Sequence, residues 1–355
     1  MMAATIEQPI RLGIVGCGAV ARLCHLKALD TLPHYEVRYL CDQNLKTAEE
    51  ARKLYGLHAE VTTKIDDFAG QVDAAIVCVW PRYHLPVTLE LLRMGMDVLC
   101  EKPIAMHHAD AVRIVQAAQQ ADRIVAVGQW CRCQINFWIL RRLLLLDYLG
   151  EIQSVEATFG NILGWPMSSG AYFDRNLTAG GVTFDGGIHV LDLVVWLFGE
   201  VRQIQYQDDS YGGVEANGVI TGSIEIGGRP VPCTVATSWT HELRNSVRVV
   251  GSKGQAEARF AQRDVVIVQQ QVGGERLTMH MTADGMTLPF RSANPYAAQL
   301  EDFAAAVRLR RPPITPAAST LLPLQIIEQA YAVRQPMPQP WVQAGLGTSC
   351  ATHES

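Results

Sequence analysis

The feature that most constrains the fold is a glycine-rich turn close to the start of the chain. Arg11–Gly16 (RLGIVG) predicts a short strand, and GCGAVARLCHLKALD follows it. The turn reads Gly16-x-Gly18-x-x-Ala21, and the segment after it predicts an amphipathic helix whose inward residues are Leu23, Leu26 and Leu29. A strand, a glycine turn and a helix in this order are the context that a dinucleotide-binding fingerprint requires.

Each small residue of this turn has its own physical reason. Gly16 permits the tight turn, Gly18 lets the backbone approach a pyrophosphate, and Ala21 lets the helix pack close to the strand. The first N–H groups of the helix are available to phosphate oxygens. The expected cofactor contacts of the turn are therefore Gly16, Cys17, Gly18, Ala19, Val20 and Ala21.

An acidic residue follows the second predicted strand, Tyr35–Cys41. Asp42 at its end can accept hydrogen bonds from the adenosine ribose hydroxyls of NAD, and its charge would repel the 2′-phosphate of NADP. Asp42 or Asn44 can also cap the helix expected at Leu45–Tyr55. The ribose role favours NAD as the cofactor, with NADP as the alternative.

Strands and helices continue to alternate after this point, and the third strand, Val72–Trp80, is apolar almost throughout. The remaining elements are a turn at Pro81–His84, a helix at His84–Met94, a strand at Asp97–Cys100, a helix from about His107 to Ala121 and a strand at Ile124–Trp130. This rotation predicts a parallel, doubly wound α/β sheet with helices on both faces.

Ligands of such sheets bind beyond the carboxyl ends of the strands. Besides the glycine turn and Asp42, the residues at those ends are Trp80, His84, Glu101, Lys102 and Gln129, and we expect them to line the cofactor site. Lys102 is the residue of greatest interest, because it stands between a strand end and Pro103. The alternative for Lys102 is an ordinary solvated loop lysine.

The second half of the chain changes character. After a helix at Gln134–Tyr148, with Ile135, Ile139, Leu143 and Leu146 inward, Ile152–Phe159 alternates apolar and polar residues. Seven further strands separated by glycine turns are expected at Val201–Gln207, Val219–Ile226, Val231–Trp239, Val247–Gly251, Ala256–Phe260, Val265–Gln271 and Leu277–Met281. They predict an α+β domain with a large open, mainly antiparallel sheet. A sheet with one uncovered face favours self-association, so we expect a homodimer or homotetramer formed through it.

The segment Gly180–Phe198 (GGVTFDGGIHVLDLVVWLF) is apolar except for three ionisable residues. On one helix, Asp185, His189 and Asp192 would share a face. Charged groups in an apolar helix line a pocket or pair with each other, so a functional trio and a satisfied core histidine are both open. The loop before this helix and a later strand end supply candidate substrate contacts: Tyr172, Arg175, Asn176, Trp239 and His241.

Length and composition set the remaining limits. The 355 residues favour two domains, at 1–130 and 131–335; helices within 294–334 are expected to pack across their junction, and an extended tail covers 336–355. A net charge of −5 disfavours nucleic-acid and membrane-surface partners, and no signal peptide or membrane-spanning run is present. Nine scattered cysteines suit reduced thiols in the cytoplasm. Cys131-x-Cys133 lacks further ligands, so no metal is expected.

Three motifs in order point to a family. Gly16-x-Gly18-x-x-Ala21, Glu101-Lys102-Pro103, and Ala179-Gly180-Gly181 leading to Asp185-x-Gly187-x-His189-x-x-Asp192 resemble the glucose–fructose oxidoreductase / inositol dehydrogenase / rhizopine-catabolism (Gfo/Idh/MocA) family. The resemblance runs from about Arg11 to Arg334. It implies an N-terminal Rossmann domain, a C-terminal domain with an open sheet, and NAD(P)-dependent chemistry on carbohydrates or polyols. The sequence departs from the family pattern at Trp80-Pro81-Arg82-Tyr83.

The resemblance also implies roles for individual residues. Lys102, Asp185 and His189 match the family's catalytic positions, and His84 matches the histidine after the third strand. A histidine can transfer the hydroxyl proton while a lysine stabilises the developing alkoxide. The expected function is hydride transfer between NAD(P) and a secondary alcohol or ketone of a sugar or polyol. The alternatives are an NAD-dependent glycosidase and a non-catalytic dinucleotide sensor.

Overall fold

The computed structural model describes residues 8–166 and 170–337 of the chain. The chain divides into two compact units, Met1–Gln134 with Thr287–Leu321 and Ile135–Met286 with Leu322–Ser355. The domain boundary expected after residue 130 and the packing of 294–334 across a junction stay predictions. The tail predicted from residue 336 lies almost entirely outside the described residues.

The first unit contains a six-stranded sheet in which every pair of neighbouring strands is parallel. The strand order is β3-β2-β1-β4-β5-β6. The strands are β1 (Ile10–Val15), β2 (Tyr35–Cys41), β3 (Glu60–Thr62), β4 (Ala74–Val77), β5 (Asp97–Cys100) and β6 (Val125–Val127). This arrangement confirms the predicted doubly wound sheet of a Rossmann domain, and it brings the carboxyl ends of β1, β4 and β5 to one edge.

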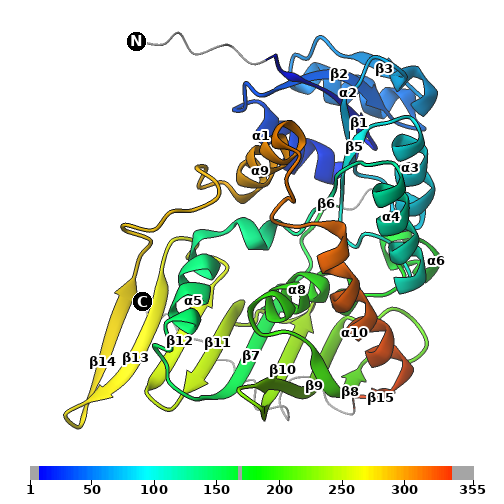
Figure 1. The fold of residues 1–355 in the computed structure, drawn as a ribbon. Helices are drawn as coiled ribbons and strands as arrows, with labels where there is room; N and C mark the ends of the chain where they lie inside the picture. Colours follow the sequence, from blue (N-terminus) through cyan, green and yellow to red (C-terminus); the bar gives the residue numbers. More distant parts are fainter. Residues whose placement is uncertain (1–7, 167–169, 338–355) are drawn as a thin grey trace, which may run out of the picture. The chain divides into compact units, whose positions relative to one another are not determined.

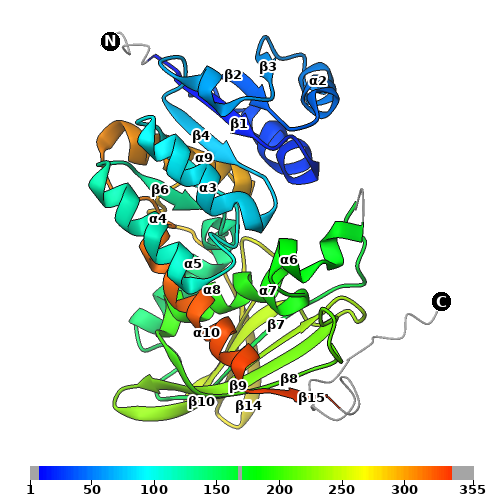
Figure 2. The ribbon, with the colours of Figure 1, turned by 90° about the vertical axis from the view of Figure 1, so that its right-hand side faces the viewer.

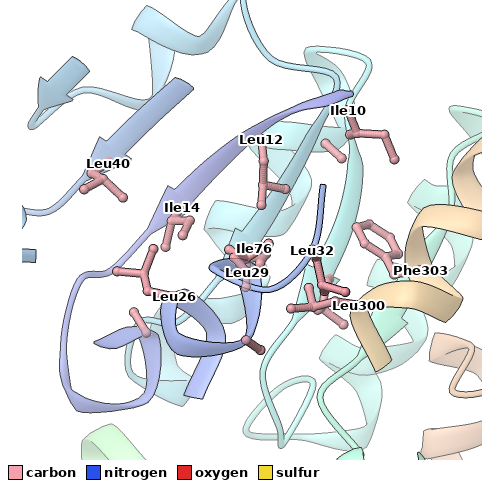
Figure 3. Packing of buried hydrophobic residues seen from close by; sticks show 14 of the residues in the cluster. Ile10, Leu12, Ile14, Leu26, Leu29, Leu32, Leu40, Ile76, Leu300 and Phe303 are labelled. Carbon is pink, nitrogen blue, oxygen red and sulfur yellow. The ribbon is translucent and has the colours of Figure 1, made fainter. Parts of the chain in front are cut away.

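Helices cover both faces of this sheet (Figure 1). They are a π-helical segment at Ala21–Leu26 continued by α1 (Lys27–Leu29), then α2 (Leu45–Leu54), α3 (Pro81–Arg93), α4 (His108–Gln120) and α9 (Pro295–Leu309), with 3-10 turns at Ile65–Phe68, Trp130–Cys133 and Ala317–Thr320. α1 packs with α9, and α3 packs with α4. Figure 3 shows that Leu300 and Phe303 of α9 pack toward the apolar residues of β1, so α9 completes a core begun almost 300 residues earlier.

One inward residue of the first helix was predicted wrongly. Leu26 and Leu29 are buried, but Leu23 is 50% exposed, and His25 occupies a fully buried position instead. The cause is the π-helical conformation of Ala21–Leu26, in which residues three apart do not share a face as they do in an α-helix.

The second unit contains a nine-stranded mixed sheet, mostly antiparallel, in the order β14-β13-β12-β11-β7-β10-β9-β8-β15. Among the described strands of this nine-stranded sheet, only the pairs β7–β10 and β8–β15 are parallel. The strands are β7 (Ile152–Gly160), β8 (Val201–Asp208), β9 (Asn217–Ile226), β10 (Arg229–Ser238), β11 (Ser246–Gly251), β12 (Gly254–Arg259), β13 (Val266–Val272), β14 (Glu275–Met281) and β15 (Arg334–Pro336). The predicted open, mainly antiparallel sheet is confirmed.

Helices lie against one side of this sheet in both views (Figures 1 and 2). α5 (Ile135–Leu145) packs on β12 and β13, and α8 (Gly187–Phe198) packs on β7, β9 and β10. The other helices of the unit are α6 (Arg175–Thr178), α7 (Val182–Asp185) and α10 (Leu321–Ala332), with a 3-10 turn at Gly170–Phe173. Leu146, predicted to face inward, is 58% exposed because α5 ends at Leu145 and the chain turns away.

No single described helix has both the length and the hydropathy needed to cross a bilayer. Arg175–Asp185 and Gly187–Phe198 reach both values only together, and the chain bends by 54° between them.

Candidate active site

The turn after β1 requires glycine at Gly16 for reasons internal to the protein. Its φ is +88°, and a Cβ at this position would lie 2.6 Å from the carbonyl oxygen of Cys78. The N–H of Gly16 donates to the carbonyl of Cys41 at 2.8 Å, which ties the turn to the end of β2. The turn is therefore held between the ends of β2 and β4.

Gly18 differs, because a Cβ there would meet no protein atom within 4 Å. Packing within the chain does not explain the glycine, and the space beside it lies where a helix begins with Ala19, Val20 and the buried Ala21. Open space against exposed N–H groups at a helix start is what a pyrophosphate needs. The residues of the turn thus fit a bound dinucleotide.

Asp42 connects the glycine turn to the loop after β2. Its Oδ2 accepts from the N–H of Cys17 at 2.8 Å, and its Oδ1 accepts from the N–H of Asn44 at 2.9 Å. Asn44, and not Asp42, is the N-cap of α2, since its side chain accepts from the N–H of Lys46. Each oxygen of Asp42 keeps a second lone pair, so the carboxylate can still accept from a ribose hydroxyl.

Two predicted cofactor residues, Trp80 and His84, follow β4. Trp80 is the N-cap of α3, and the helix begins at Pro81, three residues earlier than predicted. His84 is buried, with Nδ1 2.6 Å from the carbonyl oxygen of Pro103 and Nε2 2.9 Å from that of Val79. His84 thus joins α3 to the loop that carries Lys102.

Acidification should destabilise the protein through His84. Burial lowers the pKa of His84 and outweighs the two carbonyl contacts, which raise it. As the pH falls below about 6.5, His84 takes up a proton in the unfolded state before it does so in the folded state. The folded state therefore loses stability relative to the unfolded state until the pH reaches the folded pKa of His84. We expect Tm to fall between about pH 7 and pH 5, and less steeply in His84→Gln. Equal pH slopes of Tm for the two proteins would contradict this role of His84.

Glu101 is buried and contacts both Lys102 and His25, a histidine that was not predicted from the sequence. Glu101 Oε1 lies 2.7 Å from Nε2 of the fully buried His25, and Oε2 accepts from the N–H of Lys102 at 3.1 Å. Burial alone would raise the pKa of Glu101, but the hydrogen bond from His25 and the nearby charges lower it overall. The only sequence signal for His25 was a polar residue within an otherwise apolar helix face.

The Lys102 loop has two further features. The Lys102–Pro103 peptide bond is cis. A Cβ on Gly128 would lie 2.8 Å from the Glu101 carboxylate, so the residue after β6 leaves room for the buried acid. Next to it, Gln129 is buried, and its N–H donates to the carbonyl of Val127. Lys102 is thus carried by a loop that several buried groups define.

In the second unit, the three ionisable residues of Gly180–Phe198 do not share one helix. α7 ends at Asp185, Gly186 interrupts the chain, and α8 carries His189 and Asp192. The prediction that one helix carries all three is therefore wrong, because Asp185 is the last residue of α7 and the other two lie on α8. His189 is 4% exposed and Asp192 is fully buried, whereas Asp185 is partly exposed.

Asp185 contacts an aromatic cluster. The hydroxyl of Tyr172 donates to Asp185, and the Tyr172 ring lies 5.3 Å from the ring of Trp239. Phe173 contacts both rings edge-on and is 46% exposed. Burial, with the neighbouring Asp185 charge, raises the pKa of Tyr172 well above its ordinary value, so it stays a hydrogen-bond donor. The structure thus brings together two of the five predicted substrate residues.

The other three predicted substrate residues have local contacts. The guanidinium of Arg175 lies 5.9 Å from the centre of the Tyr331 ring. Asn176 donates to Asp174, the N-cap residue of α6, and His241 Nδ1 lies 2.8 Å from the hydroxyl of Thr240.

The candidate residues are divided between the two units. All of the predicted cofactor residues, including Lys102, lie in the first unit, and Asp185 and His189 lie in the second. Within residues 8–166 and 170–337, no group of three or more His, Cys, Asp or Glu side chains is arranged to hold a metal ion.

Two family models match the chain. One, described as "Oxidoreductase family, NAD-binding Rossmann fold", matches residues 10–129, and the other, "GFO/IDH/MocA C-terminal domain", matches residues 137–257. Among solved structures, the aldose-aldose oxidoreductase of Caulobacter crescentus superposes with a TM-score of 0.79 at 22% identity, covering 92% of this chain and 97% of that one. At that identity the likeness concerns the fold.

Several curated relatives are dehydrogenases. The D-glucoside 3-dehydrogenase of Escherichia coli is 31% identical over 204 residues, 56% of this chain and 57% of the relative. The inositol 2-dehydrogenase of Burkholderia vietnamiensis is 30% identical over 195 residues, 54% and 55% of the two chains. The trans-1,2-dihydrobenzene-1,2-diol dehydrogenase of Danio rerio is 28% identical over 260 residues, 69% and 73%. The chain thus spans little more than half the length of the first two of these relatives.

Proposed function

Since the chain belongs to the Gfo/Idh/MocA family of NAD-binding oxidoreductases, we propose that it transfers a hydride between NAD(P) and a secondary hydroxyl or carbonyl of a sugar, polyol or sugar derivative. The observation that carries the proposal is the placement of two motifs on one sheet. The glycine turn follows β1 and Lys102 follows β5, and both strands end at the same edge of the parallel sheet.

The proposed cofactor site uses the residues of that edge. Gly16 to Ala21 would hold the pyrophosphate, Asp42 the adenosine ribose, and the remaining contacts would come from Trp80, His84, Glu101, Lys102 and Gln129. The nicotinamide ring, when bound, supplies the hydride chemistry. The protein's own residues then have to orient the substrate and move one proton.

We assign the proton transfer to His189, because a histidine imidazole can both accept and return a proton in general acid–base catalysis. Lys102 would stabilise negative charge on the substrate oxygen while the proton leaves. Asp185, which accepts from Tyr172, would bind a neighbouring hydroxyl or orient the imidazole. Asp192 is fully buried and is assigned no contact with substrate.

The relatives suggest the substrate class, since their names specify a glucoside, an inositol and a dihydrodiol. Each has a hydroxyl on a six-membered carbon or sugar ring. The partly exposed rings of Tyr172 and Phe173, which pack against the buried Trp239, fit the apolar C–H face of such a ring. Arg175, Asn176 and His241 remain further candidates for hydroxyl contacts.

Asp42 should decide between NAD and NADP. Asp42→Ala is expected to weaken NAD binding by roughly tenfold, through the loss of charged hydrogen bonds to the ribose, while NADP binding falls less or improves. Calorimetric Kd values for both cofactors measure the effect. If both Kd values rose by the same factor, Asp42 would serve only to hold the N–H of Cys17.

A substrate panel tests the proposed function. Purified protein is incubated with NAD or NADP and a set of inositols, aldoses and glucosides, and the absorbance of reduced nicotinamide is followed. We expect net reduction with at least one member of the panel. Release of an aglycone without net reduction would instead indicate a glycosidase, and cofactor binding with no reaction on any compound would indicate a sensor.

The proposal includes self-association through the sheet of the second unit. Arg248 of β11, on the strand face opposite the buried Val247 and Val249, pairs with Gln255 at 2.6 Å, so this face carries polar side chains. The mass of the protein in solution by light scattering distinguishes a dimer or tetramer from a monomer.

A further inference from the structure

Glu215, in the loop between β8 and β9, binds the start of α7 through three consecutive N–H groups. Its side-chain Oε1 accepts from the N–H groups of Gly181 and Thr183, both at 3.1 Å. Its main-chain carbonyl accepts from the N–H of Val182 at 2.9 Å. The first N–H groups of a helix have no partner within the helix, so this single residue satisfies the donors that α7 leaves open.

The two glycines before α7 are explained by the same contacts. A Cβ on Gly181 would lie 2.0 Å from the carbonyl oxygen of Glu215, and a Cβ on Gly180 would lie 2.1 Å from the hydroxyl oxygen of Tyr331. Either substitution would require backbone or ring movement. Gly180 and Gly181 are therefore needed for the close approach of Glu215 and Tyr331 to α7.

Glu215 is itself held rigidly inside the second unit. It has no exposed surface, and the Tyr331 hydroxyl donates to Oε1 at 2.6 Å. The guanidinium of Arg334 lies 3.6 Å from Oε2 and packs over the Tyr331 ring at 4.7 Å. Burial raises the pKa of Glu215. A buried carboxyl with this many fixed partners restrains whatever it binds.

The restrained segment leads directly to the two proposed catalytic residues. The N–H of Asp185 donates to the carbonyl of Gly181 at 2.9 Å, and that of Gly186 donates to Val182 at 2.8 Å. After the bend, the N–H of His189 donates to Gly186 at 3.2 Å. We propose that Glu215, supported by Tyr331, is a positioning residue that fixes Asp185 and His189 for the reaction. The inference rests on the proposed function.

The test compares Glu215→Ala with Glu215→Gln, which keeps an oxygen in place of Oε1, and with Glu225→Gln, an exposed control on β9. We expect kcat to fall by about 100-fold in Glu215→Ala, as for a misplaced catalytic group, and far less in Glu215→Gln. NAD affinity should stay within about twofold in all three, since the predicted cofactor residues lie elsewhere. Amide exchange of residues 180–186 should be faster in Glu215→Ala than in the control.

A double-mutant cycle separates positioning from a general structural role. If Glu215 acts through His189 and Asp185, Glu215→Ala should lower activity much less in the His189→Ala background than it does in the wild type. If Glu215→Ala does not fold, Tyr331→Phe takes its place, because it removes the hydrogen bond to Glu215 and keeps the ring. We expect kcat of Tyr331→Phe to be several-fold lower, and this loss to be smaller in the His189→Ala background. A wild-type kcat in folded Glu215→Ala or Tyr331→Phe would overturn the positioning role of Glu215 but not the proposed function. Losses that add up in the double variants with His189→Ala would have the same meaning. Full turnover by His189→Ala would overturn the assignment of roles as well.

Discussion

Replacing His189 with alanine is expected to lower kcat by about 10²- to 10⁴-fold, the usual contribution of a general acid or base. His189 lies in the first turn of α8 and is almost completely buried, and no other histidine belongs to the described parts of α7 or α8. The reason for the large effect is that the alcohol proton must leave in the same reaction that removes the hydride. Without the imidazole, that proton loses its assigned acceptor.

Three measurements accompany this substitution. NAD affinity should be unchanged, since the predicted cofactor residues are in the other unit. The limb of the pH profile that reports the imidazole should disappear. Tm reports the cost of removing a buried side chain, and His280→Ala, at an exposed position on β14, is the control. A folded His189→Ala protein with wild-type kcat would show that His189 is a core histidine without a catalytic role.

Replacing Lys102 with alanine should produce the second large effect, a loss of about 10²- to 10³-fold in kcat, comparable to the loss of one donor that stabilises an oxyanion. The loop that carries Lys102 is fixed by Glu101, which bonds both His25 and the N–H of Lys102. The backbone position from which the Lys102 side chain extends is therefore fixed. Lys102→Arg should not restore activity, because a planar guanidinium cannot replace a compact ammonium on the same loop.

The control for Lys102 is Lys64→Ala, an exposed lysine of the same unit. Lys102→Ala and His189→Ala together should cost less than the sum of the two single losses in activation free energy, if both residues act on one substrate oxygen. Strict additivity would mean that they act independently. Unchanged kcat in Lys102→Ala would make Lys102 a solvated loop residue.

The local rules were sufficient for most of the fold. β2 and β5 begin and end at the predicted residues. β2 alternates polar residues with apolar or aromatic ones, and β5 is a short, mostly apolar run. The rotation of strands and helices identified the parallel sheet. β3 and β15 were missed, since three residues carry no readable periodicity. The prediction that Leu23 faces inward was wrong, because a π-helix changes which residues share a face.

The candidate site was less accessible to sequence reasoning. Gly16, Gly18 and Lys102 were chosen as candidate site residues because the glycine turn and the order of the strands locate them just after the ends of β1 and β5. His25 was missed, because its acceptor Glu101 is 76 residues away in the chain. Glu215 and Tyr331 were missed for the same reason, and the glycines at 180 and 181 could be recognised only as a motif. The break between α7 and α8 at Gly186 was not predicted, because the apolar pattern runs on through it.

The most direct test of hydride transfer uses a substrate from the panel that carries deuterium on the carbon to be oxidised. The reduced nicotinamide formed with unlabelled NAD is analysed by mass spectrometry. Direct transfer predicts a product one mass unit heavier than the product from unlabelled substrate, with slower turnover if transfer limits the rate. Reduced nicotinamide without the label, or no reduced nicotinamide from any substrate, would contradict the proposed function.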